Sequence, residues 1–337
     1  MKKERVVVVC PGRGTYTKET LGYLKKFRPG LNEFLNVLDE KRVALGMPTL
    51  SALDDEPVFK PLLHTKGEHA SALIYACSYA DFLNLDSENY EVVAVTGNSM
   101  GWYTALAVAS VLDMHGAFEV INTMGSMMKD QIIGGQIIYP IVDENWNLKS
   151  SAVNLVHEAL IEVQQQPECE ASISIHLGGY QVIGGNQKAL DFLLKKLPKI
   201  ENYPFQLINH AAFHTPLLKD TSDKALQILS KELFHRPQIP LIDGRGHIWT
   251  EFATDQDEIY KYTLQHQVIC EYDFTQAVTV ALKEFCPDRL VLLGPGNTLG
   301  GALGQILIQN QWLSLGSKSD FSELQSQNPF LISLGRR

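Results

Sequence analysis

A serine between two glycines is the feature of this sequence best suited to covalent chemistry. The β-branched run at residues 92–96 ends in Gly97-Asn98-Ser99-Met100-Gly101 and continues into an alanine-rich helical pattern. Strand, turn and helix are the context of a nucleophile elbow, in which a tight turn exposes the serine hydroxyl. The turn also places the Met100 N–H at a helix N-terminus, where it can stabilise a developing oxyanion. The alternative is a glycine-rich turn that contains a serine by chance.

A general base must accompany such a serine, because a hydroxyl is a weak nucleophile until its proton is removed. Imidazole is the side chain best matched to this task near neutral pH, and the chain has ten histidines. His214 precedes Thr215-Pro216, at the end of an expected strand and before an expected helix, so we expect it to face a cleft. For any one histidine, a surface position or a hydrogen-bonded interior position is the alternative.

Composition restricts the class of protein. The 337 residues are 45% hydrophobic and 20% charged, which is typical of a globular protein. A net charge of −9 without a long basic block argues against nucleic acid as a partner. No apolar run approaches the roughly 18 residues of a membrane span, and residues 6–10 are too short for a signal-peptide core, so we expect a cytoplasmic protein. The five scattered cysteines predict neither disulfides nor a metal site.

The order of the expected elements predicts an α/β fold in two parts. Buried-strand patterns at residues 6–10, 92–96, 238–242 and 290–293 alternate with helical patterns. Between them, strands at 136–142, 171–176, 180–183 and 205–208 and helices at 151–165 and 187–197 follow the ferredoxin-like order βαββαβ. We therefore expect a discontinuous, α/β-hydrolase-like catalytic domain with a mostly parallel sheet at 1–130 and 205–337. A ferredoxin-like subdomain is expected at 131–204.

Four segments of the chain, in their order along the sequence, resemble motifs of the malonyl-CoA:acyl carrier protein transacylase family. This family includes the acyltransferase domains of fatty acid and polyketide synthases. Residues 10–14 are similar to the family's FPGQG turn, and residues 97–101 to its GHSxG elbow. Residues 211–216 resemble the GAFHSP segment, and residues 293–296 the GPG turn. Residues 267–278 also resemble the QLTxPVxW segment. The family carries a ferredoxin-like insert at the corresponding place.

The resemblance implies transfer of an acyl group from acyl-CoA, through an ester on Ser99, to the phosphopantetheine thiol of an acyl carrier protein. His214 would be the base, oriented by the backbone carbonyl of Gln267. The backbone N–H groups of Arg13 and Met100 would form the oxyanion hole. The pathway would be fatty acid or polyketide biosynthesis, in a monomeric enzyme without a bound cofactor.

Several positions depart from the family pattern. Met124 stands where the family's malonyl enzymes carry an arginine that pairs with the malonyl carboxylate. A carboxylate facing methionine would be costly to bury, so this position favours an uncharged acyl group, acetyl or longer, and malonyl stays open as the alternative. Phe213 resembles the version associated with acyl groups unbranched at the α-carbon. Asn98, in place of a histidine, and His176, near a family asparagine, are also expected in the substrate pocket.

Arg13 replaces the glutamine of FPGQG, and two interpretations follow. Its side chain could supply the missing cation from another wall of the cleft. The simpler interpretation, which we prefer on sequence alone, is a solvated side chain whose backbone alone takes part.

Two functional alternatives remain open at this stage. One is an acyl-thioester hydrolase that clears wrong acyl groups from carrier proteins, which the missing arginine at Met124 suggests. The other is a non-catalytic scaffold, which the presence of both Ser99 and His214 argues against. Carrier proteins are usually acidic, so a basic patch on the subdomain is a docking hypothesis; its members are Lys188, Lys195, Lys196 and Lys199.

Overall fold

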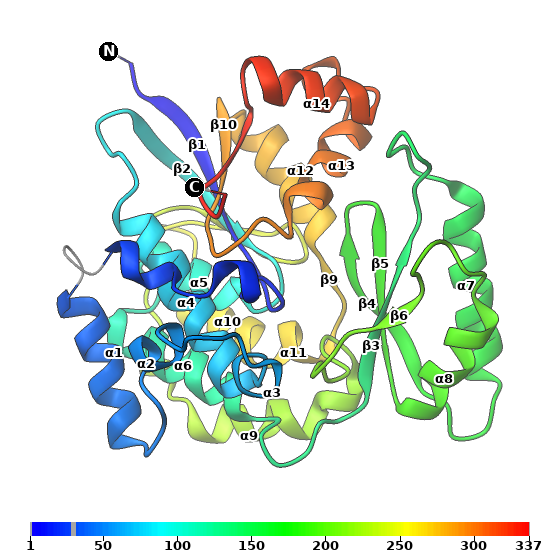
Figure 1. The fold of residues 1–337 in the computed structure, drawn as a ribbon, viewed down its shortest axis with the longest axis horizontal. Coiled ribbons are helices and arrows are strands. Elements are labelled where there is room, and N and C mark those ends of the chain that lie inside the picture. Colours follow the sequence, from blue (N-terminus) through cyan, green and yellow to red (C-terminus); the bar gives the residue numbers. More distant parts are fainter. Residues whose placement is uncertain (1, 28–31, 337) are drawn as a thin grey trace.

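The computed structural model describes residues 2–27 and 32–336, and its centre is a six-stranded sheet. The strand order is β11-β10-β1-β2-β7-β8, with β8 antiparallel to β7 and all other neighbours parallel (Figure 1). The strands are β1 (Glu4–Cys10), β2 (Tyr90–Gly97), β7 (Leu241–Ile242), β8 (Ile248–Trp249), β10 (Arg289–Leu292) and β11 (Leu331–Ser333). Residues 6–10 of β1 are completely buried, as expected for a parallel strand covered on both faces.

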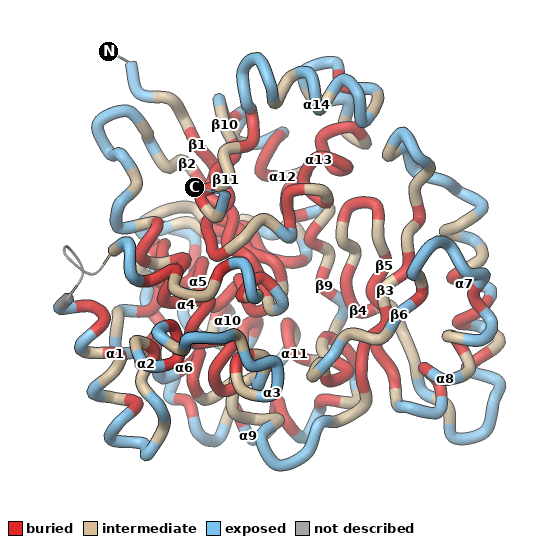
Figure 2. Tube along the Cα trace, in the orientation of Figure 1, coloured by how far each residue is buried: buried red, intermediate tan, exposed pale blue. Residues whose placement is uncertain are grey.

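Helices from distant parts of the chain cover this sheet. One group packs together and comprises α4 (Gly67–Leu83), α5 (Gly101–Val108) and α6 (Met114–Ser126). A second group comprises α12 (Phe274–Phe285), α13 (Gly300–Gln309) and α14 (Lys318–Gln327). The remaining helices of this part are α1 (Asn32–Ala44), α2 (Leu50–Asp54), α3 (Pro61–His64), α9 (Lys219–Ile228), α10 (Gln256–Lys261) and α11 (Gln267–Ile269). Figure 2 shows that buried residues concentrate in the central strands and in α4 and α5, whereas α14 is largely exposed.

A second sheet of five strands has the order β6-β3-β5-β4-β9. The strands β3 (Gly135–Pro140), β4 (Ala171–Leu177), β5 (Tyr180–Gly185) and β6 (Phe205–Gln206) form antiparallel pairs, and α7 (Ser150–Gln164) and α8 (Gln187–Lys196) cover one face. Apolar residues of these helices and strands form a core of their own. The short β9 (Tyr272–Asp273) comes from the larger part of the chain and pairs with β4, so it links the two sheets.

The predicted fold class is confirmed. The mostly parallel sheet and the inserted βαββαβ order both occur in the structure. The sequence did not predict β8, β9 or β11, because strands of two or three residues are too short to show a period. The predicted domain bounds at residues 131 and 204 stay predictions. Strand β6 of the small sheet begins at Phe205, directly after the predicted end of the subdomain.

Within the described ranges, no helix has both the length and the apolarity that a bilayer span requires. The predicted monomeric state and cytoplasmic location stay predictions.

Candidate active site

Ser99 lies in a strained turn between β2 and α5. Its backbone φ of 55° is in the left-handed region, which residues other than glycine rarely adopt. The flanking glycines make this turn possible: a Cβ on Gly97 would lie 2.3 Å from the Gly101 carbonyl oxygen, and one on Gly101 would lie 2.2 Å from the Cys10 carbonyl oxygen. The Tyr272 hydroxyl donates to the Gly97 carbonyl at 2.5 Å. This is the geometry of a nucleophile elbow.

His214 contacts the Ser99 hydroxyl directly. Its Nε2 lies 2.7 Å from Ser99 Oγ, and its Nδ1 lies 2.5 Å from the Gln267 carbonyl oxygen. Because a carbonyl can only accept, Nδ1 carries the proton and Nε2 is free to accept the serine proton. Burial lowers the pKa of His214 to about 4, against the opposing effect of the Gln267 hydrogen bond. The imidazole is therefore neutral at pH 7, the state that a general base requires.

The Gln267 side chain makes a second link that the sequence did not indicate. Its Nε2 donates to the Ser99 carbonyl at 3.1 Å, and its Oε1 accepts from the Tyr103 hydroxyl at 3.0 Å. Gln267 directly follows the π-helical turn Tyr262–His266, a feature frequent at functional sites. One residue thus contacts the backbone of Ser99 and the ring of His214. The sequence could have identified Tyr103 as a residue of this site, since a residue four positions after Ser99 lies on the same helical face.

Two backbone N–H groups lie at the same edge of the large sheet. Because β1 and β2 are parallel neighbours with Cys10 opposite Gly97, the turns after them meet. Gly12 permits this approach, since a Cβ there would lie 2.6 Å from the Asn98 carbonyl oxygen. The N–H groups of Arg13 and Met100 have no hydrogen-bond acceptor among the residues that the structure describes. Both donors are thus available to a ligand at Ser99.

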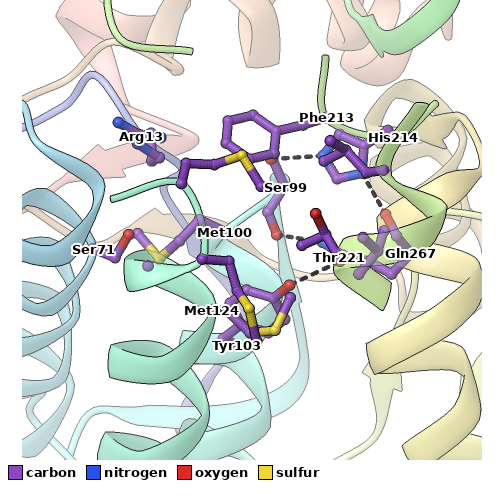
Figure 3. A pocket seen from close by; sticks show the side chains of 15 residues that line it. Arg13, Ser71, Ser99, Met100, Tyr103, Met124, Phe213, His214, Thr221 and Gln267 are labelled. Atoms are coloured by element: carbon purple, nitrogen blue, oxygen red, sulfur yellow. Dashed lines mark hydrogen bonds between the residues drawn. The ribbon is translucent and has the colours of Figure 1, made fainter. Parts of the chain in front are cut away.

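A pocket opens beside Ser99, and methionines dominate its wall (Figure 3). Its apolar lining includes Met100, Met124, Met127, Met128, Leu218 and Val268. Ser71, Tyr103 and Thr221 add hydroxyl groups. Met127 and Met128 follow Met124 at the spacing of one helical face, so a search for residues next to Met124 could have found them.

Two of the four residues expected in the substrate pocket line it, and two do not. Met124 and Phe213 contribute to the wall. Asn98 is buried beside the turn that holds Gly12, and its side-chain oxygen has no partner among the described residues. His176 lies on β4 and approaches Glu271 at 3.5 Å, away from the pocket. Side-chain direction depends on register and packing, which the motif does not specify, so a role of these two residues in the substrate site stays a prediction.

The Arg13 side chain is half-buried rather than fully solvated, which departs from the simpler interpretation. Its guanidinium lies in the pocket wall, where Nη2 donates to the carbonyl oxygens of Thr65 at 3.0 Å and Asn209 at 2.9 Å. The turn after β1 directs the side chain toward the loops before α4 and before His214, which cover it.

The small sheet supports the histidine loop through a polar chain. The Gln136 amide donates to Ser174 Oγ at 2.6 Å, and that hydroxyl donates to the Phe213 carbonyl at 2.8 Å. His210 Nδ1 lies 2.8 Å from Gln136 Oε1. Gln136 and Ser174 are buried, and a buried network of this kind holds its members in fixed positions. The loop that carries His214 is therefore tied to β3 and β4.

The four lysines proposed for docking do not form a patch beside the pocket. They lie on or after α8, on the side of the small sheet that faces away from the large sheet (Figure 1), and are Lys188, Lys195, Lys196 and Lys199. Lys188 pairs with Glu168 at 2.8 Å, and Lys196 with Glu162 at 2.7 Å. These acidic partners reduce the local positive charge. Docking of a carrier protein on these lysines stays a prediction.

Histidines with lowered pKa values predict that acid destabilises the fold. Burial lowers the pKa of His210 to about 3, of His69 to about 4 and of His214 to about 4. In the unfolded chain the same imidazoles become protonated near pH 6.5. Because the unfolded state then binds more protons than the folded state, the free energy of unfolding should fall as pH drops from about 6.5 toward 4. Thermal unfolding across this range measures the effect. His210→Gln should weaken the pH dependence, whereas His157→Gln, at an exposed position on α7, should not; equal pH dependence in wild type and His210→Gln would contradict the prediction.

Comparison with known sequences identifies distant relatives. No family model matches the chain. A non-reducing polyketide synthase of Aspergillus terreus is 25% identical over 272 residues, which is 76% of this chain and 9% of the synthase. A malonyl CoA-acyl carrier protein transacylase of Haemophilus influenzae is 23% identical over 265 residues, covering 76% of this chain and 77% of the transacylase. The chain thus spans about a tenth of the synthase's length and most of the transacylase's.

Comparison with solved structures identifies the same fold. A malonyl-transacylase solved in complex with a type II polyketide synthase acyl-carrier protein has a TM-score of 0.73 at 22% identity, covering 91% of this chain and 94% of that one. The malonyl-CoA:acyl carrier protein transacylase of Xanthomonas oryzae has a TM-score of 0.72 at 22% identity, and the match covers 97% of this chain and 99% of that one. The resemblance to this family found in the sequence is confirmed.

Proposed function

We propose that this chain, which has the fold of malonyl-CoA:acyl carrier protein transacylases, is an acyltransferase that carries its acyl group on Ser99. The donor is an acyl-CoA, and the acceptor is the phosphopantetheine thiol of an acyl carrier protein. One observation carries the proposal: the hydrogen-bonded series from Ser99 Oγ through His214 to the Gln267 carbonyl. Nucleophile, base and orienting group are the three parts that covalent acyl transfer needs.

In the first half-reaction, Ser99 Oγ attacks the thioester carbonyl while His214 Nε2 accepts the hydroxyl proton. The negative charge on the carbonyl oxygen is stabilised by the N–H groups of Arg13 and Met100. The tetrahedral intermediate then breaks its C–S bond, and the imidazolium returns the proton to the departing CoA thiolate. An acyl ester on Ser99 remains. The Gln267 carbonyl keeps Nδ1 protonated throughout, which holds the ring in the productive tautomer.

The second half-reaction reverses these steps with a new thiol. The carrier protein's phosphopantetheine enters after CoA leaves, and His214 accepts its thiol proton. The thiolate attacks the acyl ester, the same two N–H groups stabilise the intermediate, and Ser99 Oγ leaves with the proton from His214. No group other than the two substrates and these residues enters the reaction.

The comparisons do not support the hydrolase alternative. The relatives named above are transacylases and a polyketide synthase.

Incubation with acyl-CoA donors tests the proposal directly. We expect intact-mass spectrometry to detect a single acyl adduct with at least one donor among malonyl-, acetyl- and butyryl-CoA. After CoA is removed, holo-carrier protein should discharge the adduct and become acylated.

Apo-carrier protein is the matched control, since it lacks only the phosphopantetheine thiol and should leave the adduct intact. Absence of an adduct with every donor would overturn the proposal. Discharge by water as fast as by holo-carrier protein would favour hydrolysis instead.

A further inference from the structure

Tyr272 is a buried side chain that contacts both the turn of the nucleophile and the general base. Its hydroxyl donates to the Gly97 carbonyl at 2.5 Å, where β2 ends and the turn of Ser99 begins. Its ring centroid lies 5.3 Å from that of the His214 ring, with the two planes at 51°. Burial raises the pKa of the Tyr272 phenol well above its usual value. The phenol therefore stays protonated at neutral pH and remains a donor.

The backbone around Tyr272 is held by both sheets. On one side, β9 pairs with β4 of the small sheet (Figure 1), where Tyr272 lies opposite Ile175. On the other side, the Asp273 N–H donates to the Gly244 carbonyl at 2.7 Å, in the turn after β7. Gly244 leaves room for the ring, since a Cβ there would lie 2.6 Å from Tyr272 Cδ2. Elements other than the elbow and the histidine loop thus set the position of this side chain.

The segment that ends in Tyr272 holds the elbow at two points. The Gln267 amide donates to the Ser99 carbonyl at 3.1 Å, and the Tyr272 hydroxyl donates to the Gly97 carbonyl. The transacylase segment QLTxPVxW, aligned from Gln267, has valine at the position of Tyr272. Valine has no hydroxyl to donate and no ring to place beside an imidazole. Both contacts of Tyr272 are therefore additions of this chain to that motif.

We propose that Tyr272 is a positioning residue for acyl transfer, which sets the distance between Ser99 Oγ and His214 Nε2. This proposal rests on the proposed function. The hydroxyl fixes the peptide at which the turn begins, and the ring limits the motion of the imidazole. Both contacts favour the 2.7 Å hydrogen bond between Oγ and Nε2, and the reaction rate depends steeply on such alignment. Because the ring covers part of the imidazole, it also contributes to the burial that lowers the pKa of His214.

Tyr272→Phe removes only the hydroxyl and tests the contact with Gly97. We expect the maximal rate of single-turnover acylation to fall about tenfold, within the roughly 100-fold that a misplacement of about 1 Å can cost. The acyl-CoA concentration that gives half of this rate should stay unchanged, because Tyr272 does not line the acyl pocket.

Tyr139→Phe is the matched control. Tyr139 on β3 is as buried as Tyr272, and its hydroxyl also donates to a backbone carbonyl, that of Pro198 at 3.1 Å. Since each variant loses one tyrosine–carbonyl hydrogen bond, their thermal midpoints should fall by similar amounts. Only Tyr272→Phe should slow acylation.

Tyr272→Val tests the contact of the ring with His214. Burial and the Gln267 carbonyl are the causes that shift the pKa of His214, to about 4. Without the ring, water reaches the imidazole and its pKa should rise toward the ordinary value near 6.5. The acidic limb of the acylation rate should move up with it, because protonated His214 cannot act as base. In Tyr272→Phe, which keeps the ring, the limb should stay where wild type has it.

The outcomes separate this proposal from the proposed function. A wild-type rate in Tyr272→Phe, an equal loss of rate in Tyr139→Phe, or an unmoved limb in folded Tyr272→Val would overturn the role of Tyr272 while acyl transfer stands. Absence of an acyl adduct on wild type with every donor would overturn the proposed function itself. Tyr272→Phe keeps the shape of the side chain, so it decides the question even if Tyr272→Val does not fold.

Discussion

Ser99→Ala is expected to lower acyl transfer by at least about 10⁴-fold, because it removes the atom that forms the acyl ester. The alanine side chain leaves the backbone N–H groups of Arg13 and Met100 in place. Substrate binding and oxyanion stabilisation should therefore persist while the covalent route is lost. Intact-mass spectrometry should show no acyl adduct with any donor, and stopped-flow measurement of CoA release should show no burst.

Ser151→Ala is the matched control, since Ser151 is an exposed serine on α7. It should retain both the adduct and the burst. An acyl adduct of undiminished yield on Ser99→Ala would show that another residue is the nucleophile. The thermal midpoint of Ser99→Ala should stay close to that of wild type, because the φ of 55° strains serine and alanine alike and only the hydrogen bond to His214 is lost.

His214→Ala is expected to slow acylation by about 10³- to 10⁴-fold, the range that a positioned general base contributes. The Ser99 hydroxyl would then have to lose its proton to water. The KM for acyl-CoA should change little, because His214 holds the nucleophile rather than the CoA. His157→Ala, at an exposed position on α7, is the control and should retain wild-type kinetics. A loss of less than tenfold would contradict the role of His214 as base.

The pH profile gives an independent test of the same residue. Neutral His214 is the active form, and burial lowers its pKa to about 4. The rate should therefore be flat from about pH 8 to pH 5 and fall only below that, as the imidazole becomes protonated. In His214→Ala this acidic limb should disappear. A limb near pH 6.5 in wild type would mean that the imidazole is hydrated rather than buried.

The parts of the site that follow from neighbouring residues could be predicted from the sequence. The elbow needs glycines on both sides of Ser99 and a strand and helix around it, and all of these are local. The parallel strands before Arg13 and Ser99 end at the same edge of a sheet, so their meeting could also be expected. The order βαββαβ was readable because each of its main elements is long enough to show a period.

Side-chain direction could not be predicted in the same way. Asn98 and His176 belong to the right segments, yet neither lines the pocket. The Gln267 side chain reaches Ser99 across 168 positions of sequence, a contact that no local pattern encodes. The lysines around α8 share a helix, but the packing of that helix places them on the outer face.

Sequence alone therefore determined the fold class of this protein and picked out Ser99 and His214 as the candidate nucleophile and base, because backbone turns and periodic burial depend on residues a few positions apart. Only the tertiary structure decided the environment of Arg13. Its guanidinium is enclosed by loops that contribute Thr65 and Asn209, 52 and 196 positions away. Burial and charge pairing are properties of such distant contacts. The same arginine that looked solvated in the sequence is half-buried in the fold, where its guanidinium donates to these two backbone carbonyl groups.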